Sequence, residues 1–290
     1  VTLCQQVHPA RGAGNRQRPR LGSPSPTMDS HDHKHINKNR FADSAGVPWE
    51  GRSFESNPFS NDDGSANPAL ISALAEFRAN PTDPRGVFAA FAASRLLIPL
   101  LADLGESGEG AHGQTVDKSA DLSIVTVQTP DGETGLPVFS SVESMGRWNK
   151  TARPVPSDAI RVALAAASEG NTRIVLDPGS ETEFVFRRPA IKAMALQQEW
   201  VPSFLNTAVG QAFAEPLDEN EPSVLAIYLE AGDPNSRLEG AELQITLKLV
   251  AGLSQDDVQA LIGRLTDAWA TSELIAESVD SMQLRLIAAE

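Results

Sequence analysis

The chain has very little cysteine and no long apolar run. Its 290 residues include one cysteine, Cys4, which lies in a basic segment at the start of the sequence. No disulfide can form within the chain, and the rest of it can hold neither a cysteine nucleophile nor a cysteine-ligated metal. The most apolar stretch, residues 87–104, contains Arg95 and Asp103 and is too short to span a bilayer. These absences predict a cytoplasmic protein that makes no contact with the membrane.

Histidine is also scarce where a fold is expected. Four of the five histidines lie in the first 35 residues, and His112 stands alone in a Gly- and Glu-rich segment. A Ser-His-Asp triad therefore has no credible base. The alternating His31, His33 and His35 have no rigid frame on which to hold a metal, so only weak binding is expected there. Phosphate-binding and dinucleotide-binding glycine motifs are missing as well, and we expect neither a metal nor a cofactor.

The charge of the chain is strongly uneven. Residues 1–40 contain seven Lys or Arg and two acids, a net charge of +5. Because the whole chain carries −14, the remaining residues carry −19. A body this acidic repels phosphate backbones and anionic lipid, so nucleic acid and membrane are not expected partners.

The first 64 residues are predicted to be a disordered tail. Residues 1–27 are rich in Arg, Pro, Ser and Gly and show no apolar periodicity. We expect Met28 to be the true translation start, with a genuine tail as the alternative. Residues 41–64 contain scattered apolar side chains, including Trp49, Phe54 and Phe59. These side chains either pack onto the first domain, which we favour, or form a short motif for a partner.

Apolar periodicity places a first domain at residues 65–199. An N-cap at Asn67 and a proline at position 68 begin a helix. Alternating strands at 122–128 and 134–139 flank a Pro-Asp-Gly turn, and a second strand pair lies at 173–176 and 184–186. Pro137 has no N–H, so its strand is expected to have an edge or a bulge there. The pattern predicts an α+β domain, a mixed or antiparallel sheet with flanking helices.

A second, smaller domain is predicted at residues 223–290. Residues 200–222 mix Pro, Asn, Glu and Asp and are typical of a linker. Strands are expected at 223–229, 242–249 and 282–286, and a capping-box variant at Ser254 and Asp257 begins a helix before the last strand. This order defines a β-β-α-β unit.

Two motifs carry the one family resemblance. Leu136-Pro-Val-Phe-Ser-Ser141 is followed by Trp148 and then by Leu176-Asp-Pro-Gly-Ser180. Over residues 67–199 the order of these motifs resembles the N-terminal domain of the SseB family. The resemblance implies a bacterial protein from a family linked by its name to enhanced serine sensitivity. It supplies no agreed catalytic residues.

The same motifs contain the candidate site residues. An arginine beside an aromatic residue, Arg147-Trp148, can recognise an anion or a peptide, although such a pair more often has Trp148 in the core and Arg147 at the surface. The turn containing Asp177 and Gly179 exposes backbone N–H groups, and Arg187-Arg188 follow nearby, so together they can hold an anion. The alternative is a tight hairpin turn beside two solvated arginines.

The sequence therefore predicts a non-catalytic interaction or regulatory protein with an unidentified protein partner. A small-molecule or anion-binding module, with a possible link to serine metabolism, is the first alternative. A carboxylate-dependent enzyme is the second, because acidic residues are plentiful.

Overall fold

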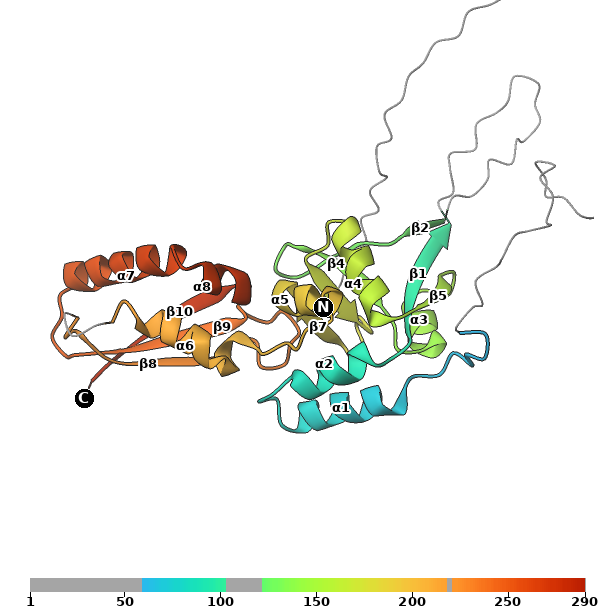
Figure 1. The fold of residues 1–290 in the computed structure, drawn as a ribbon, viewed down its shortest axis with the longest axis horizontal. Coiled ribbons are helices and arrows are strands. Elements are labelled where there is room, and N and C mark those ends of the chain that lie inside the picture. The colour runs from blue at the N-terminus through green and yellow to red at the C-terminus, as the bar shows by residue number, and fades with distance from the viewer. Residues whose placement is uncertain (1–58, 103–121, 218–220, 290) are drawn as a thin grey trace, which may run out of the picture. The chain divides into compact units, whose positions relative to one another are not determined.

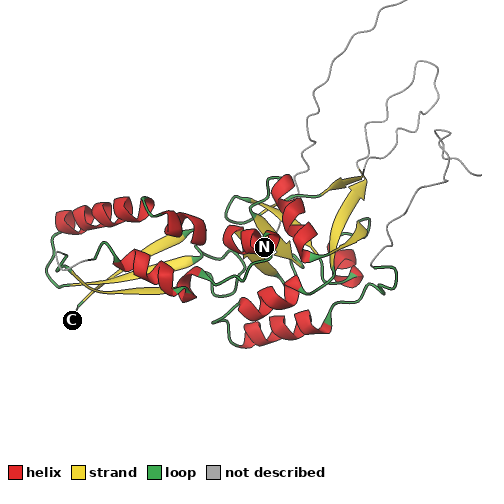
Figure 2. Cartoon of the chain, viewed as in Figure 1, coloured by secondary structure: helices red, strands yellow, loops and turns green. Residues whose placement is uncertain are grey.

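The computed structural model describes residues 59–102, 122–217 and 221–289. Within these ranges the chain forms eight α-helices, one 3₁₀ helix and ten strands arranged in three sheets (Figure 1). Helices and strands are mixed along the chain (Figure 2), which confirms the α+β class. None of the helices described is long and apolar enough to cross a membrane. The predictions for Cys4, Met28, the three N-terminal histidines and His112 fall outside the described residues.

The described residues of the N-terminal domain form five helices and seven strands. In chain order they are α1 (Pro68–Ala79), α2 (Arg85–Ala92), β1 (Leu96–Ala102), β2 (Leu122–Ile124), β3 (Val127–Gln128), β4 (Thr134–Val138), α3 (Val142–Trp148), β5 (Arg153–Ser157), α4 (Ala159–Ser168), β6 (Arg173–Leu176), β7 (Phe184–Arg187) and α5 (Arg188–Ala195). One sheet has the order β2-β1-β5 and the other β3-β4-β6-β7. An isolated bridge between Leu97 and Phe139 connects the two sheets.

The second sheet explains how a proline is accommodated in β4. This strand pairs in parallel with β6 and antiparallel with β3. The carbonyls of Thr134 and Val138 accept hydrogen bonds from the β6 side, so by alternation the nitrogen of Pro137 faces away from β6. On that side β3 has already ended, since it pairs only with residues 134 and 135. The missing N–H therefore leaves no ladder bond unmade.

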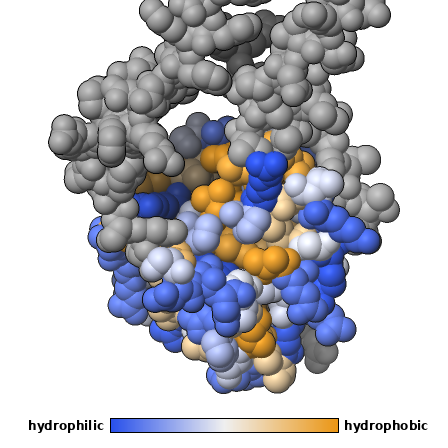
Figure 3. Space-filling model, turned by 90° about the vertical axis from the view of Figure 1, so that its right-hand side faces the viewer, coloured by the Kyte–Doolittle hydropathy of each residue, from blue (hydrophilic) through white to orange (hydrophobic). Residues whose placement is uncertain are grey.

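Aromatic side chains fill the core between these sheets and the helices. Phe91 and Phe186 lie with ring centroids 4.5 Å apart, and Phe184 and Phe186 lie 4.8 Å apart. The side chain of Asn67 accepts the Ala69 N–H and caps α1 as the sequence predicts. On the side that faces right in Figure 1, hydrophobic residues reach the surface in a strip with hydrophilic residues around it (Figure 3).

The C-terminal region begins earlier than the sequence indicates. Its elements are η1 (Ser203–Leu205), α6 (Thr207–Ala214), β8 (Val224–Ala231), β9 (Leu243–Leu249), α7 (Gln255–Ala270), α8 (Glu273–Ser278) and β10 (Met282–Ala288). The range 200–222, predicted as a linker, thus contains α6. Val209 and Phe213 of this helix are fully buried, and the Trp269 indole N–H donates to the Phe213 carbonyl at 3.1 Å. Val209 and Phe213 are its only buried residues, which is too few to show a helical period in the sequence.

The C-terminal sheet has the order β10-β9-β8. β9 pairs antiparallel with β8 and parallel with β10. Leu243, Ile245, Leu247 and Leu249 of β9 are buried in one core with Trp269. This agrees with the alternation in the sequence, and α8 is an addition to the predicted β-β-α-β order. The described residues from Asp63 onward belong to one compact unit.

Candidate functional site

The two sequence motifs meet at one edge of the second sheet. Because β4 and β6 are parallel, their carboxyl ends lie side by side, and Asp177 follows β6 there. Its side chain is buried and accepts four hydrogen bonds from neutral donors. They come from the Ser140 N–H (2.9 Å), the Ser140 hydroxyl (2.6 Å), the Ser144 hydroxyl (2.7 Å) and the Thr182 hydroxyl (2.9 Å). We call these four residues the Asp177 cluster.

The cluster holds a turn of unusual backbone conformation. Asp177 has φ +45° and Gly179 has φ +76°. A non-glycine residue in the left-handed region is uncommon and persists where surrounding contacts determine it. Here the Asp177 N–H donates to the Val138 carbonyl at 2.8 Å, and the Ser180 N–H donates back to the Asp177 carbonyl at 3.1 Å. Residues 177–182, the Asp177 turn, are therefore fixed from both sides.

A hollow of about 440 Å³ opens beside this turn. It is lined by Ser144, Arg147, Trp148 and residues 178–182, and we call it the Trp148 hollow. Trp148 is half-buried, and its ring packs against Phe139 with centroids 5.2 Å apart. Arg147 is 65% exposed, and it forms an ion pair with the still more exposed Glu143 of its own helix. An exposed i,i+4 pair of this kind holds its guanidinium weakly.

The helix that carries these two residues is anchored to the cluster. Ser141 caps α3 by accepting the Ser144 N–H, and the Ser144 hydroxyl lies 3.3 Å from the Ser141 N–H in a capping box. The same Ser144 hydroxyl also donates to Asp177. The Asp177 cluster thus positions both walls of the Trp148 hollow, the start of α3 and the Asp177 turn.

A second hollow, of about 420 Å³, also borders the turn. Gly179 and Ser180 line both hollows, and this one also includes Glu183, Arg237 and Glu239; we call it the Arg237 hollow. Arg237 donates to the carbonyls of Ser180 and Glu181 at 3.0 Å.

The turn does not present free N–H groups in the way that the sequence interpretation assumes. The Gly179 N–H donates to the Glu183 carboxylate at 2.5 Å. A carboxylate of the chain itself therefore occupies the backbone donor to which an anion was expected to bind.

The structure brings together four of the six predicted site residues. Arg147, Trp148 and Gly179 line the Trp148 hollow, and Asp177 lies beneath it. Arg187 and Arg188 line neither hollow. Arg187 is buried and binds Asp233 at 2.8 Å, while Arg188 donates to the carbonyls of Ala276 and Val279. Both guanidinium groups therefore bind residues of the C-terminal region, and neither lies beside the turn.

Arg187 is part of a buried network that the sequence did not reveal. Arg173, its partner across the β6–β7 ladder, binds Asp131 and Asp280, each at 2.9 Å. Arg187 binds Asp280 at 3.4 Å as well as Asp233. These five residues form what we call the arginine network. Burial opposes ionisation of Asp131, but the Thr129 hydrogen bond and the charge of Arg173 outweigh it and lower the pKa of that carboxyl.

The loop that contains Asp233 is organised around its carboxylate. Asp233 accepts the N–H groups of Arg237, Leu238 and Glu239. This conformation directs the Ser236 carbonyl toward β7, where it accepts the Val185 N–H at 2.8 Å. The loop therefore covers an edge strand of the N-terminal domain while it holds Arg187.

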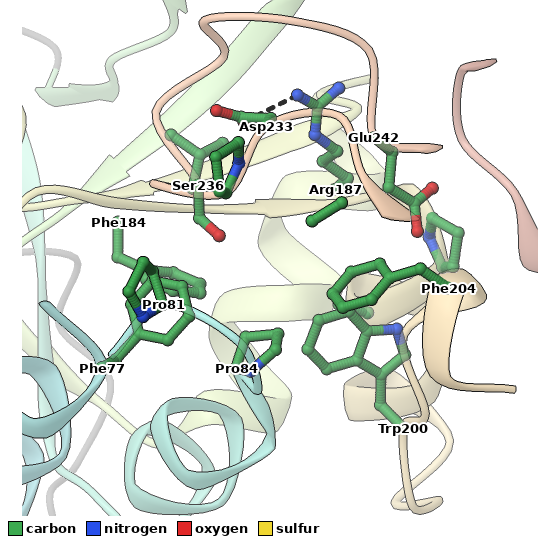
Figure 4. Close-up of a pocket in the computed structure, with 15 residues that line it drawn as sticks. Phe77, Pro81, Pro84, Phe184, Arg187, Trp200, Phe204, Asp233, Ser236 and Glu242 are labelled. Atoms are coloured by element: carbon green, nitrogen blue, oxygen red, sulfur yellow. Dashed lines mark hydrogen bonds and ion pairs between the residues drawn. The ribbon is translucent and has the colours of Figure 1, made fainter. Parts of the chain in front are cut away.

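A small cavity of about 40 Å³ lies next to the network. Figure 4 shows Arg187 and Asp233 at one side and the rings of Trp200 and Phe204 at the other. A cavity of this size holds a few water molecules rather than a metabolite. Burial raises the pKa of Glu242 on its wall, although that carboxylate accepts the Ser203 hydroxyl at 2.8 Å and the Asp280 N–H at 2.6 Å. The buried Trp200 indole nitrogen has no hydrogen-bond partner among the residues that the structure describes.

Among the residues that the structure describes, no three His, Cys, Asp or Glu side chains are grouped to hold a metal. The candidate site lies in an α+β domain, where the parallel strands β4 and β6 end. It consists of the Asp177 carboxylate with its serine and threonine donors, and of Arg147 and Trp148 beside them. Residues 70–193 match the family model described as the SseB protein N-terminal domain. This part of the chain is therefore an SseB N-terminal domain. No curated protein and no solved structure matches the chain.

Proposed function

We propose that this chain is a non-catalytic interaction or regulatory protein of the SseB family that works in the bacterial cytoplasm. It binds a protein partner at the Trp148 hollow. The observation that carries the proposal is the exposed Arg147 and half-buried Trp148 on a wall that the buried Asp177 cluster positions. Tryptophan and arginine are the residues most enriched among those that dominate binding energy at protein interfaces.

The role of the Asp177 cluster supports binding rather than proton transfer. Each carboxylate oxygen of Asp177 accepts two hydrogen bonds. Oδ1 accepts the Ser140 N–H and the Ser144 hydroxyl, and Oδ2 accepts the hydroxyls of Ser140 and Thr182. A carboxylate with its acceptor sites filled in this way orients its donors. These hydrogen bonds fix the conformation of the rim before a partner binds. Less conformational entropy is then lost on association.

The charge at the rim favours a partner segment with an acidic side chain. Arg147 lies at the lip of the hollow, and Trp148 supplies the adjacent apolar surface. An aspartate or glutamate of the partner can replace the weakly held Glu143 at the Arg147 guanidinium. A neighbouring apolar residue of the partner then contacts the indole ring.

A small-molecule or anion-binding module remains the alternative. The two hollows, of about 440 and 420 Å³, fall in the range of small-molecule sites. The Arg237 hollow combines Arg237 with Glu183 and Glu239, groups of both charges. A ligand that carries both an amino and a carboxylate group, with serine as the first one to test, suits that combination.

The test compares Arg147→Glu with Arg161→Glu. These arginines are 65% and 66% exposed, and each pairs with one acid on or next to its own helix, so the two variants change the net charge alike. Proteins captured by the tagged full chain from its native host are quantified by mass spectrometry. We expect a partner set that Arg147→Glu loses and Arg161→Glu retains. Equal capture by both variants contradicts the proposal.

The alternative has a separate readout. Thermal shift of the purified chain is measured with serine, inorganic phosphate and small dicarboxylates. A shift that Arg237→Ala abolishes and Arg147→Glu preserves assigns a ligand to the Arg237 hollow. No shift with any of these compounds, together with loss of partners from Arg147→Glu, favours the protein partner.

A further inference from the structure

Strand edges are protected almost everywhere in this protein. Unpaired backbone groups at a sheet edge invite pairing with another chain, and proteins protect them with short strands, proline, bulges or covering loops. Of the six edge strands in the described sheets, β2 and β3 have three and two residues, β5 contains Pro154 and Pro156, Ser236 covers β7 at Val185, and β8 has an irregularity beside Val224. The sixth edge strand, β10, has none of these features.

β10 is long, regular and apolar at its surface. Seven consecutive residues, Met282–Ala288, pair with β9 without a register shift. The strand contains no proline and no lysine. Met282 and Leu286 are 43% and 38% exposed, although both side chains lie on the face that carries the core. An unprotected edge with exposed apolar side chains is the arrangement that a paired strand covers.

Two hydrogen bonds show which backbone groups of β10 face away from β9. The Leu243 N–H donates to the Ser281 carbonyl, and the Ala289 N–H donates to the Leu249 carbonyl. In a parallel ladder both groups of one residue face the same neighbour and the next residue faces the other way. The odd-numbered residues of β10 therefore face β9. Met282, Leu284 and Leu286 present their N–H and C=O groups outward.

We propose that β10 pairs antiparallel with β10 of a second copy of this chain, about a two-fold axis at Leu284. This register places Leu284 opposite itself as a hydrogen-bonded pair and Met282 opposite Leu286 of the second copy, so all three outward residues find partners. The two exposed apolar side chains then meet across the interface. The two three-stranded sheets become one continuous sheet of six strands.

The side chains of β10 select this register. On the opposite face of the sheet, Gln283 lies beside Arg285 of the second copy, a polar pair. A register centred on Arg285 sets two like charges directly opposite each other, which is destabilising. In the sequence Met-Gln-Leu-Arg-Leu, apolar and polar residues alternate in the same order from either end. A two-fold interface requires such a self-complementary strand, whereas pairing with an unrelated peptide does not.

Sedimentation equilibrium of the full chain over a range of concentrations tests the pairing. We expect the mass to rise from 30.9 kDa toward twice that value, and Leu286→Lys to abolish the rise. The matched control is Leu225→Lys, which changes an exposed leucine on the other edge strand, β8. A monomer at all concentrations overturns the proposal. A dimer that Leu286→Lys leaves intact, or that Leu225→Lys abolishes, also overturns it.

A second pair of variants tests the register and does not depend on the folding of Leu286→Lys. Gln283→Glu sets an acid beside Arg285 of the second copy at two symmetric positions, and Gln283→Lys sets a like charge there. We expect the dimer dissociation constant to fall about threefold or more for Gln283→Glu and to rise by a similar factor for Gln283→Lys. Equal dissociation constants for the two variants overturn the Leu284-centred register. No ligand enters these measurements, so their outcome is independent of the function proposed above.

Discussion

The Asp177 cluster and the arginine network stabilise buried charge in two different ways. In the cluster, one carboxylate is surrounded by neutral donors that lie within 37 residues of it in the sequence. In the network, two guanidinium groups and three carboxylates pair over separations of 42 to 107 residues. The first arrangement positions a local surface, and the second connects distant parts of the chain. Buried charge thus has a structural role in both places. Neutral donors nearby in the sequence give it a local role, and charged partners far along the chain give it a long-range one.

Removal of Asp280 is expected to have the largest effect, because both arginines of the network share it. Asp280→Ala leaves Arg173 and Arg187 each with one carboxylate in a buried setting. Loss of one member of a buried ion pair costs about 3–5 kcal/mol. The free energy of unfolding from urea titration measures this loss. Asp267→Ala, at an exposed position of α7, should stay within about 0.5 kcal/mol of the unchanged protein; an equally small effect at Asp280 contradicts the role of the network.

Asp177 variants probe the cluster by the same measurement. Asp177→Ala removes the acceptor of the buried Ser140 N–H and places alanine at positive φ, and we expect a loss of about 3 kcal/mol. Asp177→Asn should lose less than half as much, since the amide oxygen can keep the bonds from the Ser140 N–H and the Ser144 hydroxyl, and the hydroxyls of Ser140 and Thr182 can reorient to accept from the amide nitrogen. Glu181→Ala, exposed in the same turn, is the control. Equal losses for the alanine and asparagine variants contradict the hydrogen-bond account.

A glycine pair separates the backbone contribution of the turn from its contacts. A Cβ added at Gly179 or at Gly146 meets no atom within 4 Å, but only Gly179 has positive φ. Gly179→Ala should therefore destabilise the protein by about 1 kcal/mol, and Gly146→Ala, in α3, should stabilise it by about 0.5–1 kcal/mol. Melting temperatures that shift in the same direction for both variants contradict this assignment.

Glu242 offers the smallest expected effect and the only one that depends on pH. Burial raises its pKa in the folded state, so folding favours its protonated form. Its contribution to the free energy of unfolding is unfavourable above the folded pKa and improves as the pH falls through that value toward the unfolded value near 4.5. Glu242→Gln, which resembles the protonated acid, should melt higher at pH 7 to 8 and lose this advantage toward pH 5. A difference that grows as the pH falls contradicts the assignment.

The parts that could be predicted from the sequence were those set by local pattern. Alternation located β9, and the capping residues located the starts of α1 and α7. The motif order located the Asp177 turn, and Arg147 and Trp148 were found beside it. The strand, the two helix starts and the turn each rest on residues that are neighbours in the chain, so a single sequence contains enough information for them.

The rest depended on contacts between distant residues. Arg187 and Arg188 follow the Asp177 turn closely in the sequence, which made them candidates for an anion site. Their partners, Asp233, Asp280 and the end of α8, lie 46 to 93 residues further along, and no local pattern identifies such pairs. α6 was missed for a related reason, because Val209 and Phe213 are its only buried residues and two apolar positions do not define a period.

The loop around Asp233 has a consequence for how the protein can evolve. Its Ser236 covers the β7 edge, and its Asp233 neutralises Arg187, so the N-terminal domain depends on residues that lie beyond position 199. Exchange of the C-terminal region by recombination would expose an edge strand and two buried arginines at once. The two regions should therefore be inherited together, with changes at Arg187 and Asp233 arising as compensating pairs in related proteins.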